Sequence, residues 1–367
     1  MKILYDHQTF TIQQFGGISR YFFELIKRFN TVKSSCSVGA VFSNNAYLNK
    51  NTYLGVQPFF PNSNFKGKDF LYTRSNQYKS LKDLKAQKFD VFHPTYYNDY
   101  FLDHIGKKPF VVTFYDMIHE KFHSQYSELS NDMPVYDFKR KLAEKAERII
   151  AISETTKNDI IDIYGTDENK IDVVYLGNSL ERTIVGEQRI VGQEYVLFVG
   201  NRSLYKNFEG FTTVIADQLK ANSLFLVCAG GGAFSEQEMN FIKKMKLEKS
   251  IVHIKKIDDS ILSNLYSNAL FFAFPSLYEG FGIPVLESFA SNCPTLLSTG
   301  GSLPEIGGEA AVYFDPYDQN SLFSAVENLI SNTDLRTELV QKGEARIKEF
   351  SWDKTFQETM KIYKQIT

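Results

Sequence analysis

The chain has 367 residues, of which 43% are hydrophobic and 23% are charged, and its formal net charge at pH 7 is −2. This length favours two domains, each large enough for its own core, and the composition is ordinary for a soluble globular protein. No run of eighteen apolar residues occurs in the sequence, so no membrane-spanning helix is predicted.

The first residues, MKILYD, reach an aspartate at once and lack a secretory pattern, so we expect a cytoplasmic protein. The three cysteines are scattered and form neither a CxxC motif nor a zinc-binding cluster with histidines. Residues 1–180 carry 23 Lys and Arg against 20 Asp and Glu, and the remainder carries 18 against 23. The mildly basic first half is compatible with peripheral contact at the inner face of a membrane, although so small an excess favours a solvated surface.

The first expected elements are a strand at Lys2–Asp6, a polar loop and the glycine pair Gly16 and Gly17. Apolar residues at helical spacing follow, from Ile18 to Phe29. A strand, a glycine pair and an amphipathic helix can face a phosphate, but without a GxGxxG pattern a plain strand-to-helix turn is equally compatible.

A strand is expected at Ser37–Ser43, followed by a long aromatic and polar loop over residues 44–75 and a helix at Ser75–Gln87. Two buried strands then run over Phe89–Thr95 and Pro109–Asp116. Both end in polar residues, His93 in the first and Asp116 in the second. Because ligands of open α/β sheets bind at the carboxyl ends of strands, these residues are candidates for a site.

The first half closes with further helices and strands. Residues 133–147 are expected to form a helix with Tyr136, Leu142 and Ala146 on one side and charged residues opposite. The next elements are a strand at Arg148–Ser153, a helix that ends at Gly165, a strand at Lys170–Asn178 and an irregular linker over residues 179–193.

The alternation of strands and helices restarts at Val196–Val199. Gly200 ends this strand, and Arg202 and Lys206 precede a helix at Phe208–Leu219. Two cations beside a helix N-terminus can clamp a diphosphate, with a planar fork from arginine and a point charge from lysine. Taken alone, the same pattern fits two surface bases.

Three more expected elements lead to the most informative segment: a strand at Leu224–Gly232 that ends in glycines, a strand at Ile251–Ile257 and a helix at Ser260–Leu270. Amphipathic helices close the chain, and Trp352, the only tryptophan, is expected in the core.

Residues 275–305 read PSLYEGFGIPVLESFASNCPTLLSTGGSLPE. They follow an apolar strand at Leu270–Phe274, and a glycine-rich turn leads to a helix at Pro284–Ser291. Exposed N–H groups at a helix start attract an anion, whereas the carboxylates Glu279 and Glu287 accept hydrogen bonds from hydroxyls. The combination suits a ligand that has both phosphate and polyol groups, such as a nucleotide sugar, but the spacing alone is equally compatible with a plain strand-turn-helix connection that carries two solvated glutamates.

The pair of glutamates in EGFGIPVLE, with the later segments GGSLPEIGG and YFDPYD, resembles the signature of family 4 of the retaining GT-B glycosyltransferases. The resemblance covers nearly the whole chain and is strongest over residues 194–316. It implies an α/β fold with two Rossmann-like parallel-sheet domains facing a cleft and a C-terminal helix that crosses back to the first domain. The implied boundaries are 1–178 for the acceptor domain, 179–193 for the linker, 194–350 for the donor domain and 351–367 for the returning helix.

The resemblance also assigns roles to residues. Lys206 and Arg202 would stabilise the leaving diphosphate, Glu279 would hold the donor sugar with the backbone of Phe281 and Gly282, and Glu287 would hold the ribose or the sugar-phosphate. Asp116 completes the catalytic set. Further donor-binding residues would be Gly16, Gly17, Gly200, Ile283, Ile257 and Leu262.

One position departs from many relatives, which carry a histidine just before the aspartate to contact the donor sugar. Tyr115 stands there in this chain, with His119 four residues further on. Either residue, or His93, could supply the sugar contact. Ser153 is a weaker candidate.

The implied reaction is retaining, metal-independent transfer of a hexose from GDP-mannose or a UDP-hexose to a glycan or lipid-linked acceptor in surface polysaccharide synthesis. No cofactor, metal or nucleic-acid partner is expected. Two alternatives stay open: a sugar-nucleotide epimerase related to the GT-B enzymes, and a catalytically silent nucleotide-binding subunit.

Overall fold

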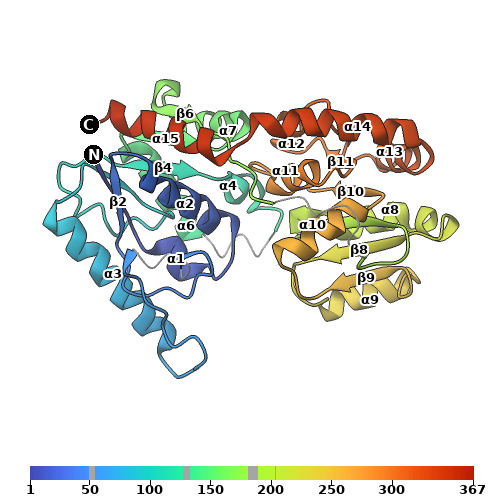
Figure 1. Ribbon diagram of the computed structural model, residues 1–367, viewed down its shortest axis with the longest axis horizontal. Coiled ribbons are helices and arrows are strands. Elements are labelled where there is room, and N and C mark those ends of the chain that lie inside the picture. The colour runs from blue at the N-terminus through green and yellow to red at the C-terminus, as the bar shows by residue number, and fades with distance from the viewer. Residues whose placement is uncertain (49–53, 127–132, 181–188, 203) are drawn as a thin grey trace. The chain divides into compact units, whose positions relative to one another are not determined.

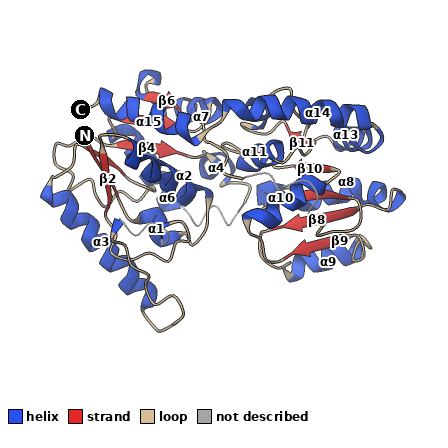
Figure 2. Cartoon of the chain, viewed as in Figure 1, coloured by secondary structure: helices blue, strands red, loops and turns tan. Residues whose placement is uncertain are grey.

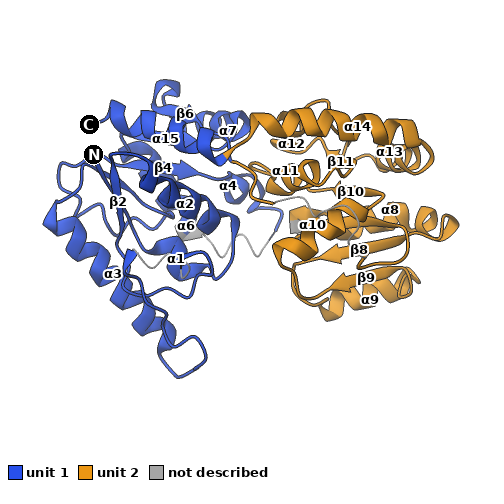
Figure 3. Cartoon of the chain, viewed as in Figure 1, with its two compact units in different colours: residues 1–176, 352–367 blue, residues 177–351 orange. Residues whose placement is uncertain are grey.

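The computed structural model describes residues 1–48, 54–126, 133–180, 189–202 and 204–367. The chain divides into two compact units, one of residues 1–176 and 352–367 and the other of residues 177–351 (Figure 3). The residues expected as a linker, 179–193, fall in the second unit, and 181–188 lie outside the described residues. Within the described residues, no helix combines the length and apolar character that crossing a bilayer requires.

The first unit is a parallel sheet with helices packed on it (Figures 1 and 2). Strands β2-β1-β3 and β4-β5-β6 form two three-stranded ladders, and a single bridge between Phe92 and Phe110 joins β3 to the chain entering β4. Its elements are β1 (Lys2–Tyr5), α1 (Gln8–Ile12), α2 (Gly17–Arg28), β2 (Ser35–Val38), α3 (Lys68–Ala86), β3 (Val91–His93), β4 (Val111–Phe114), α4 (Ile118–Phe122), α6 (Met133–Lys145), β5 (Arg148–Ala151), α7 (Glu154–Tyr164), β6 (Ile171–Val173) and α15 (Trp352–Gln365).

Helix α15 belongs to the first unit although it follows the second unit in the chain. It packs against α2, where the buried ring of Trp352 lies 6.4 Å from the ring of Tyr21. Deeper in the unit, the hydroxyl of Tyr363 lies 3.1 Å from that of Tyr5 on β1. The C-terminal helix therefore returns to the first unit and contributes to its core, with Trp352 as a core residue.

Two elements of the first unit differ from expectation. The short helix α1 occupies part of the expected polar loop before the glycine pair. Helix α3 begins at Lys68, whereas the sequence analysis placed residues 68–74 in the long loop and the start of the helix at Ser75. The expected start was wrong because this helix buries polar residues and exposes aromatic ones, so it lacks the usual amphipathic pattern.

The second unit is a six-stranded parallel sheet in the order β12-β11-β10-β7-β8-β9. Its elements are β7 (Tyr195–Val199), η5 (Leu204–Lys206), α8 (Phe208–Ala221), β8 (Phe225–Ala229), α9 (Glu236–Lys244), β9 (Ile251–Ile254), α10 (Asp259–Asn268), β10 (Phe271–Phe274), α11 (Ile283–Ala290), β11 (Thr295–Ser298), α12 (Leu303–Gly307), β12 (Val312–Phe314), α13 (Gln319–Ser331) and α14 (Thr333–Arg346).

The strand order of the second unit creates a topological switch point. From β7 the chain builds outward through β8 and β9, then returns to the other side of β7 with β10 and continues to β12. The connections leave β7 and β10 in opposite directions, so a crevice is expected outside the carboxyl ends of these two neighbouring strands. Strands β7, β8, β10 and β11 are almost entirely buried, which explains why they read as continuous apolar runs in the sequence.

Candidate functional site

A lysine and a glutamate meet at the switch point of the second unit. Lys206 ends η5 after β7, and Glu279 lies in the loop after β10. The ammonium Nζ of Lys206 and the carboxylate Oε1 of Glu279 form a direct ion pair, and their side chains are only 17% and 10% exposed. The structure thus brings together two residues that lie 73 positions apart in the sequence.

Aromatic rings and backbone contacts hold this ion pair in place. Lys206 Nζ lies 5.0 Å from the ring centre of Tyr205 and 5.3 Å from that of Phe274. The backbone N–H of Leu277 donates to the carbonyl of Tyr205 over 2.7 Å, which ties the two loops together. The pair is therefore largely shielded from water. In such a poorly solvated environment, a charge interacts more strongly with a ligand.

The loop from Glu279 to Gly282 is fixed by the loop after β11. The hydroxyl of Ser302 donates to the carbonyls of Glu279 and Phe281, at 3.1 and 3.0 Å. A side chain at Gly301 would place its Cβ 2.3 Å from the Glu279 carbonyl oxygen, so only glycine permits this approach. Gly282, with φ of +98°, is the residue that caps α11.

Helix α11 begins at Ile283, so Glu287 lies just beyond its first turn, whereas the expected start at Pro284 would have placed Glu287 inside the first turn. The half-buried Glu287 accepts a hydrogen bond of 3.2 Å from the hydroxyl of Tyr266 on α10. Burial, together with this carboxylate, raises the pKa of Tyr266 well above its ordinary value. Tyr266 consequently stays a hydrogen-bond donor to Glu287.

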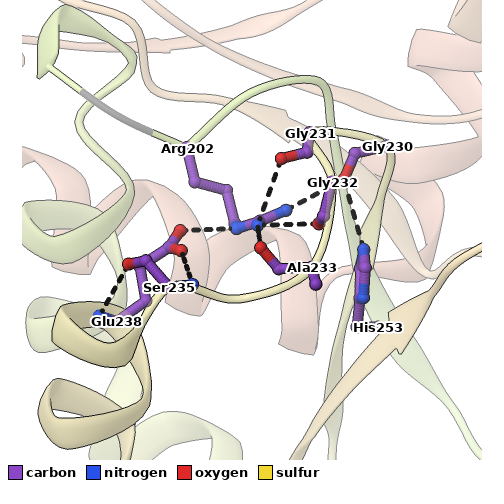
Figure 4. Close-up of polar contacts among 8 residues, drawn as sticks. All are labelled: Arg202, Gly230, Gly231, Gly232, Ala233, Ser235, Glu238 and His253. Carbon is purple, nitrogen blue, oxygen red and sulfur yellow. Dashed lines mark hydrogen bonds and ion pairs between the residues drawn. The ribbon is translucent and has the colours of Figure 1, made fainter. Parts of the chain in front are cut away.

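Arg202 makes a different set of contacts from Lys206 (Figure 4). Its Nε donates to Oε1 of Glu238 over 2.7 Å, and its two terminal nitrogens donate to carbonyls of the turn after β8, at Gly230, Gly231, Gly232 and Ala233. The guanidinium also lies 4.5 Å from the ring centre of Phe234. The structure therefore gives Arg202 contacts with the glycine turn, and its role in a diphosphate clamp stays a prediction.

Three more predicted donor-binding residues follow strands of the same sheet. Gly200 has a φ of +111° and ends β7, where its N–H donates to the carbonyl of Ala229 on β8. Ile257 lies after β9 and Leu262 on α10, and both side chains are half-buried. All three lie on the carboxyl side of their strands, as expected for a ligand of this sheet.

In the first unit, Gly16 and Gly17 stand at the start of α2. A Cβ at Gly16 would meet the side-chain oxygen of Gln13 at 2.4 Å, and that oxygen instead accepts the N–H of Ser19 over 3.1 Å. Gly17 is exposed at the helix start, where an anion could approach its backbone, whereas the N–H of Ser19 in the same turn is already bonded to Gln13.

Tyr115 and Asp116 follow β4. Tyr115 is 8% exposed, its N–H donates to the hydroxyl of Tyr97 over 3.0 Å, and its own buried hydroxyl has no hydrogen-bond partner among the residues that the structure describes. Burial raises the pKa of Tyr115 well above its ordinary value, so this hydroxyl stays protonated. Asp116 is half-buried, and its carboxylate accepts the N–H of Ile118 over 3.1 Å.

A buried lysine that the sequence reasoning missed supports this loop. Lys139 on α6 has no exposed surface, and its Nζ donates to the carbonyl of Asp116 over 2.8 Å and to Oε2 of Glu120 over 2.9 Å. Lys139 lies three residues before Leu142 and seven before Ala146, on the apolar stripe of its helix. A lysine at a core-facing position was the signal in the sequence that could have revealed it.

The expectation that His93 could contact a sugar was wrong. His93 is completely buried, with Nδ1 2.6 Å from the hydroxyl of Tyr363 and Nε2 2.9 Å from that of Thr113. Burial lowers the pKa of His93 to about 3. Ser153 is likewise buried and caps α7 by accepting the N–H of Thr156 over 3.0 Å, whereas His119 lies half-buried on α4.

Fold and site together define a two-domain α/β protein of the Rossmann type, with a charged pair at the switch point of its second sheet. Two family models match the chain: "Glycosyltransferase Family 4" over residues 15–182 and "Glycosyl transferases group 1" over residues 181–346. The chain belongs to family 4 of the glycosyltransferases, and its fold is GT-B.

Relatives and solved structures agree with this placement. The chain is 26% identical over 305 residues to an uncharacterized glycosyltransferase of Methanocaldococcus jannaschii, which covers 78% of each chain. It is 23% identical over 301 residues to the O-antigen chain mannosyltransferase B of Escherichia coli, covering 77% of this chain and 76% of the relative. The structure of Anabaena HepE in complex with UDP and glucose superposes over 100% of both chains, with a TM-score of 0.76 and 17% sequence identity.

Proposed function

We propose that this chain transfers a hexose, with mannose favoured, from a nucleotide sugar to a glycan or lipid-linked acceptor in surface polysaccharide synthesis. The observation that carries the proposal is the Lys206–Glu279 ion pair at the switch point of the second sheet. A cation and a carboxylate held side by side suit a donor whose phosphates adjoin sugar hydroxyls.

The ion pair can serve both parts of such a donor. A lysine ammonium has three N–H donors, so Lys206 can keep its bond to Glu279 while donating to phosphate oxygens. Negative charge grows on the nucleoside diphosphate as the bond to the sugar breaks, and a fixed cation stabilises that charge. Glu279 accepts hydrogen bonds from sugar hydroxyls while it remains beside the same lysine.

The first unit contributes a polar contact of its own. Within the described part of the chain, the buried hydroxyl of Tyr115 has no hydrogen-bond partner, and such a group is destabilising unless a ligand or water satisfies it. It follows β4, at the carboxyl edge where open α/β sheets bind ligands. We assign Tyr115 the sugar contact that a histidine makes in many relatives, with Asp116 beside it as a further catalytic residue.

The choice of donor rests on the relatives. The Escherichia coli relative is named a mannosyltransferase, which favours GDP-mannose, whereas the UDP and glucose bound to Anabaena HepE support a UDP-hexose. A thermal-shift series with GDP, UDP and ADP separates these cases, because a ligand of the folded state raises the melting temperature. We expect GDP to give the largest shift.

Transfer of labelled mannose from GDP-mannose to a polysaccharide-type acceptor tests the function itself. Lys206→Ala and Glu279→Gln should each lower kcat by roughly 100- to 1,000-fold, the usual effect of removing one fixed transition-state contact. Lys342→Ala is the matched control, because Lys342 forms an exposed ion pair with Glu338 on α14 and should leave the rate unchanged.

Other outcomes would assign the chain differently. Conversion of the donor into an isomeric nucleotide sugar without transfer would indicate an epimerase. Nucleotide binding without turnover of any donor, in wild type and variants alike, would indicate a silent binding subunit. Proton NMR of the product tests retention of the anomeric configuration, and full activity in the presence of EDTA is the result expected for metal independence.

A further inference from the structure

Helix α3 of the first unit exposes large apolar residues on its outer face, whereas its inner face buries two polar residues together with Tyr72 and Leu84. Asn76 and Ser80 are 0% and 1% exposed, whereas Phe70, Leu71 and Tyr78 are 63%, 50% and 70% exposed. A helix that packs on a sheet normally does the opposite. Exposed apolar side chains gathered on one element mark an interaction surface more often than isolated ones do.

The buried face of α3 is held firmly, so fraying does not explain the exposure of the aromatic residues. The Asn76 side chain accepts the N–H groups of Val41 and Phe42, at 3.0 and 2.9 Å, and donates to the carbonyl of Phe42 over 2.9 Å. The hydroxyl of Ser80 donates to the carbonyl of Gly39 over 2.6 Å. These contacts fix the rotation of the helix and turn its aromatic face outward.

The turn that precedes α3 continues the apolar surface. Phe60 and Phe65 are 56% and 39% exposed, and their rings meet edge to face with centres 5.5 Å apart. Lys68 closes this turn by donating to the carbonyls of Phe60 and Ser63, at 2.9 and 2.7 Å. Figure 1 shows the turn at the end of α3 that lies farthest from the strands of the first unit. We call Phe60, Phe65, Phe70, Leu71 and Tyr78 the α3 surface.

Positive charge surrounds the α3 surface. Residues 60–88 contain seven Lys and Arg against two Asp, a net charge of +5 in a chain whose total is −2. Arg74 lies one turn after Phe70, with its guanidinium 5.5 Å from the ring centre, and Lys82 follows Tyr78 by one further turn. One of the two aspartates, Asp83, is already paired with Lys79.

We infer that the α3 surface docks on a bilayer that contains anionic lipids. Aromatic and leucine side chains partition into the boundary between headgroups and acyl chains, and an anionic surface attracts nearby lysine and arginine residues. The exposed apolar groups of the α3 surface suit insertion between lipids, and the neighbouring lysine and arginine residues suit anionic headgroups. The inference concerns where the protein binds and is independent of the sugar that it transfers.

Co-sedimentation of the whole protein with vesicles tests the inference. Phosphatidylglycerol-rich vesicles should bind the protein at about 0.1 M salt, and phosphatidylcholine vesicles should bind it at least about 10-fold more weakly. Phe65→Ser/Phe70→Ser/Leu71→Ser and, separately, Lys66→Gln/Arg74→Gln/Lys82→Gln/Lys85→Gln should each reduce binding by at least about 10-fold. All seven side chains are exposed or lie on the outer face, so these variants should fold.

The matched control is Tyr317→Ser/Phe323→Ser, which removes two exposed aromatic side chains from the second unit and should leave vesicle binding unchanged. The variant Phe70→Trp reports insertion directly, because the chain's own tryptophan, Trp352, is only 4% exposed. Brominated lipids should quench the fluorescence added at position 70 and leave that of Trp352 unaffected.

Three results would overturn the inference. The first is equal binding to anionic and neutral vesicles, or equal binding by wild type and the apolar variant. The second is that wild-type protein binds neither kind of vesicle but binds a single-stranded oligonucleotide through the same residues. This result would make the α3 surface a nucleic-acid site. The third is that the protein binds neither kind of vesicle and self-associates through these residues in sedimentation velocity. This result would make the α3 surface a contact between copies of the chain.

Discussion

Lys139 and Glu120 form an ion pair in which Nζ and Oε2 are 2.9 Å apart and neither side chain has exposed surface. The other carboxylate oxygen of Glu120 accepts the hydroxyl of Tyr164 over 2.7 Å, and Lys139 also donates to the carbonyl of Asp116. A buried pair with its hydrogen bonds satisfied fixes geometry more than it adds stability. Here it fixes the loop after β4 that carries Tyr115 and Asp116.

Lys139→Met should lower the free energy of unfolding by roughly 3–5 kcal/mol, because Glu120 would remain buried without its cation. The double variant Lys139→Met/Glu120→Gln should recover part of this loss in urea denaturation. Lys141→Met is the control, since Lys141 lies on the same helix but pairs with Asp99 at the surface. Equal stability of Lys139→Met and wild type would contradict a supporting role for this pair.

The sequence predicted most of the parallel strands because buried strands read as short apolar runs, as at Leu270–Phe274 for β10. It also singled out Lys206 and Glu279, which the structure places in contact. Periodicity could not locate the start of α3, where polar residues are buried and aromatic ones exposed.

Contacts between side chains distant in the chain could not be predicted from local patterns. Arg202 was expected beside a diphosphate, and nothing near it in the sequence points to Glu238, 36 residues later. His93 ends a strand, as site residues do, but its neighbour Tyr363 comes from a helix 270 residues away. Tertiary packing decided both environments.

The buried His93 should make stability depend on pH. Its pKa in the folded protein, about 3, lies below the ordinary value of 6.5, so the unfolded chain takes up a proton first as the pH falls. The contribution of neutral, buried His93 to the free energy of unfolding is complete above about pH 6.5 and is lost progressively between about pH 6.5 and about pH 3. Between pH 7 and pH 5, the free energy of unfolding should fall by roughly 2 kcal/mol from this residue.

Urea denaturation of wild type and His93→Gln at both pH values measures this difference. Thr113→Val is the control, because it removes a hydrogen-bond partner of His93 without removing the titrating group. It should lower stability at pH 7 and keep the wild-type pH dependence. An unchanged pH dependence in His93→Gln would show that other groups govern acid destabilisation.

Two adjacent glycines offer a matched test of the turn after β8. Gly231 and Gly232 have φ of +72° and +74°, so alanine is strained at either position. A Cβ at Gly231 would also lie 2.5 Å from the carbonyl oxygen of Gly200 and 2.8 Å from Nη1 of Arg202, whereas one at Gly232 would meet no atom of the described residues within 4 Å apart from its chain neighbours. Gly231→Ala should therefore lower the free energy of unfolding by roughly 1–3 kcal/mol more than Gly232→Ala. Equal effects in thermal denaturation would mean that the loop adapts to the added methyl group.

The pairing of Arg202 with Glu238 allows two roles of the arginine to be separated. Hydrogen bonds from Arg202 and Ser235 lower the pKa of Glu238 although desolvation opposes the shift, so this carboxylate anchors the guanidinium against the glycine turn. If Arg202 acts by holding the turn, Glu238→Gln should weaken binding of GDP or UDP about 3- to 10-fold while Arg202 stays intact. Isothermal titration calorimetry measures the change. Glu236→Gln is the control, because Glu236 is exposed on the same turn of α9. Unchanged or tighter binding in Glu238→Gln would instead favour direct contact between Arg202 and the diphosphate, since the freed guanidinium would then be more available to the ligand.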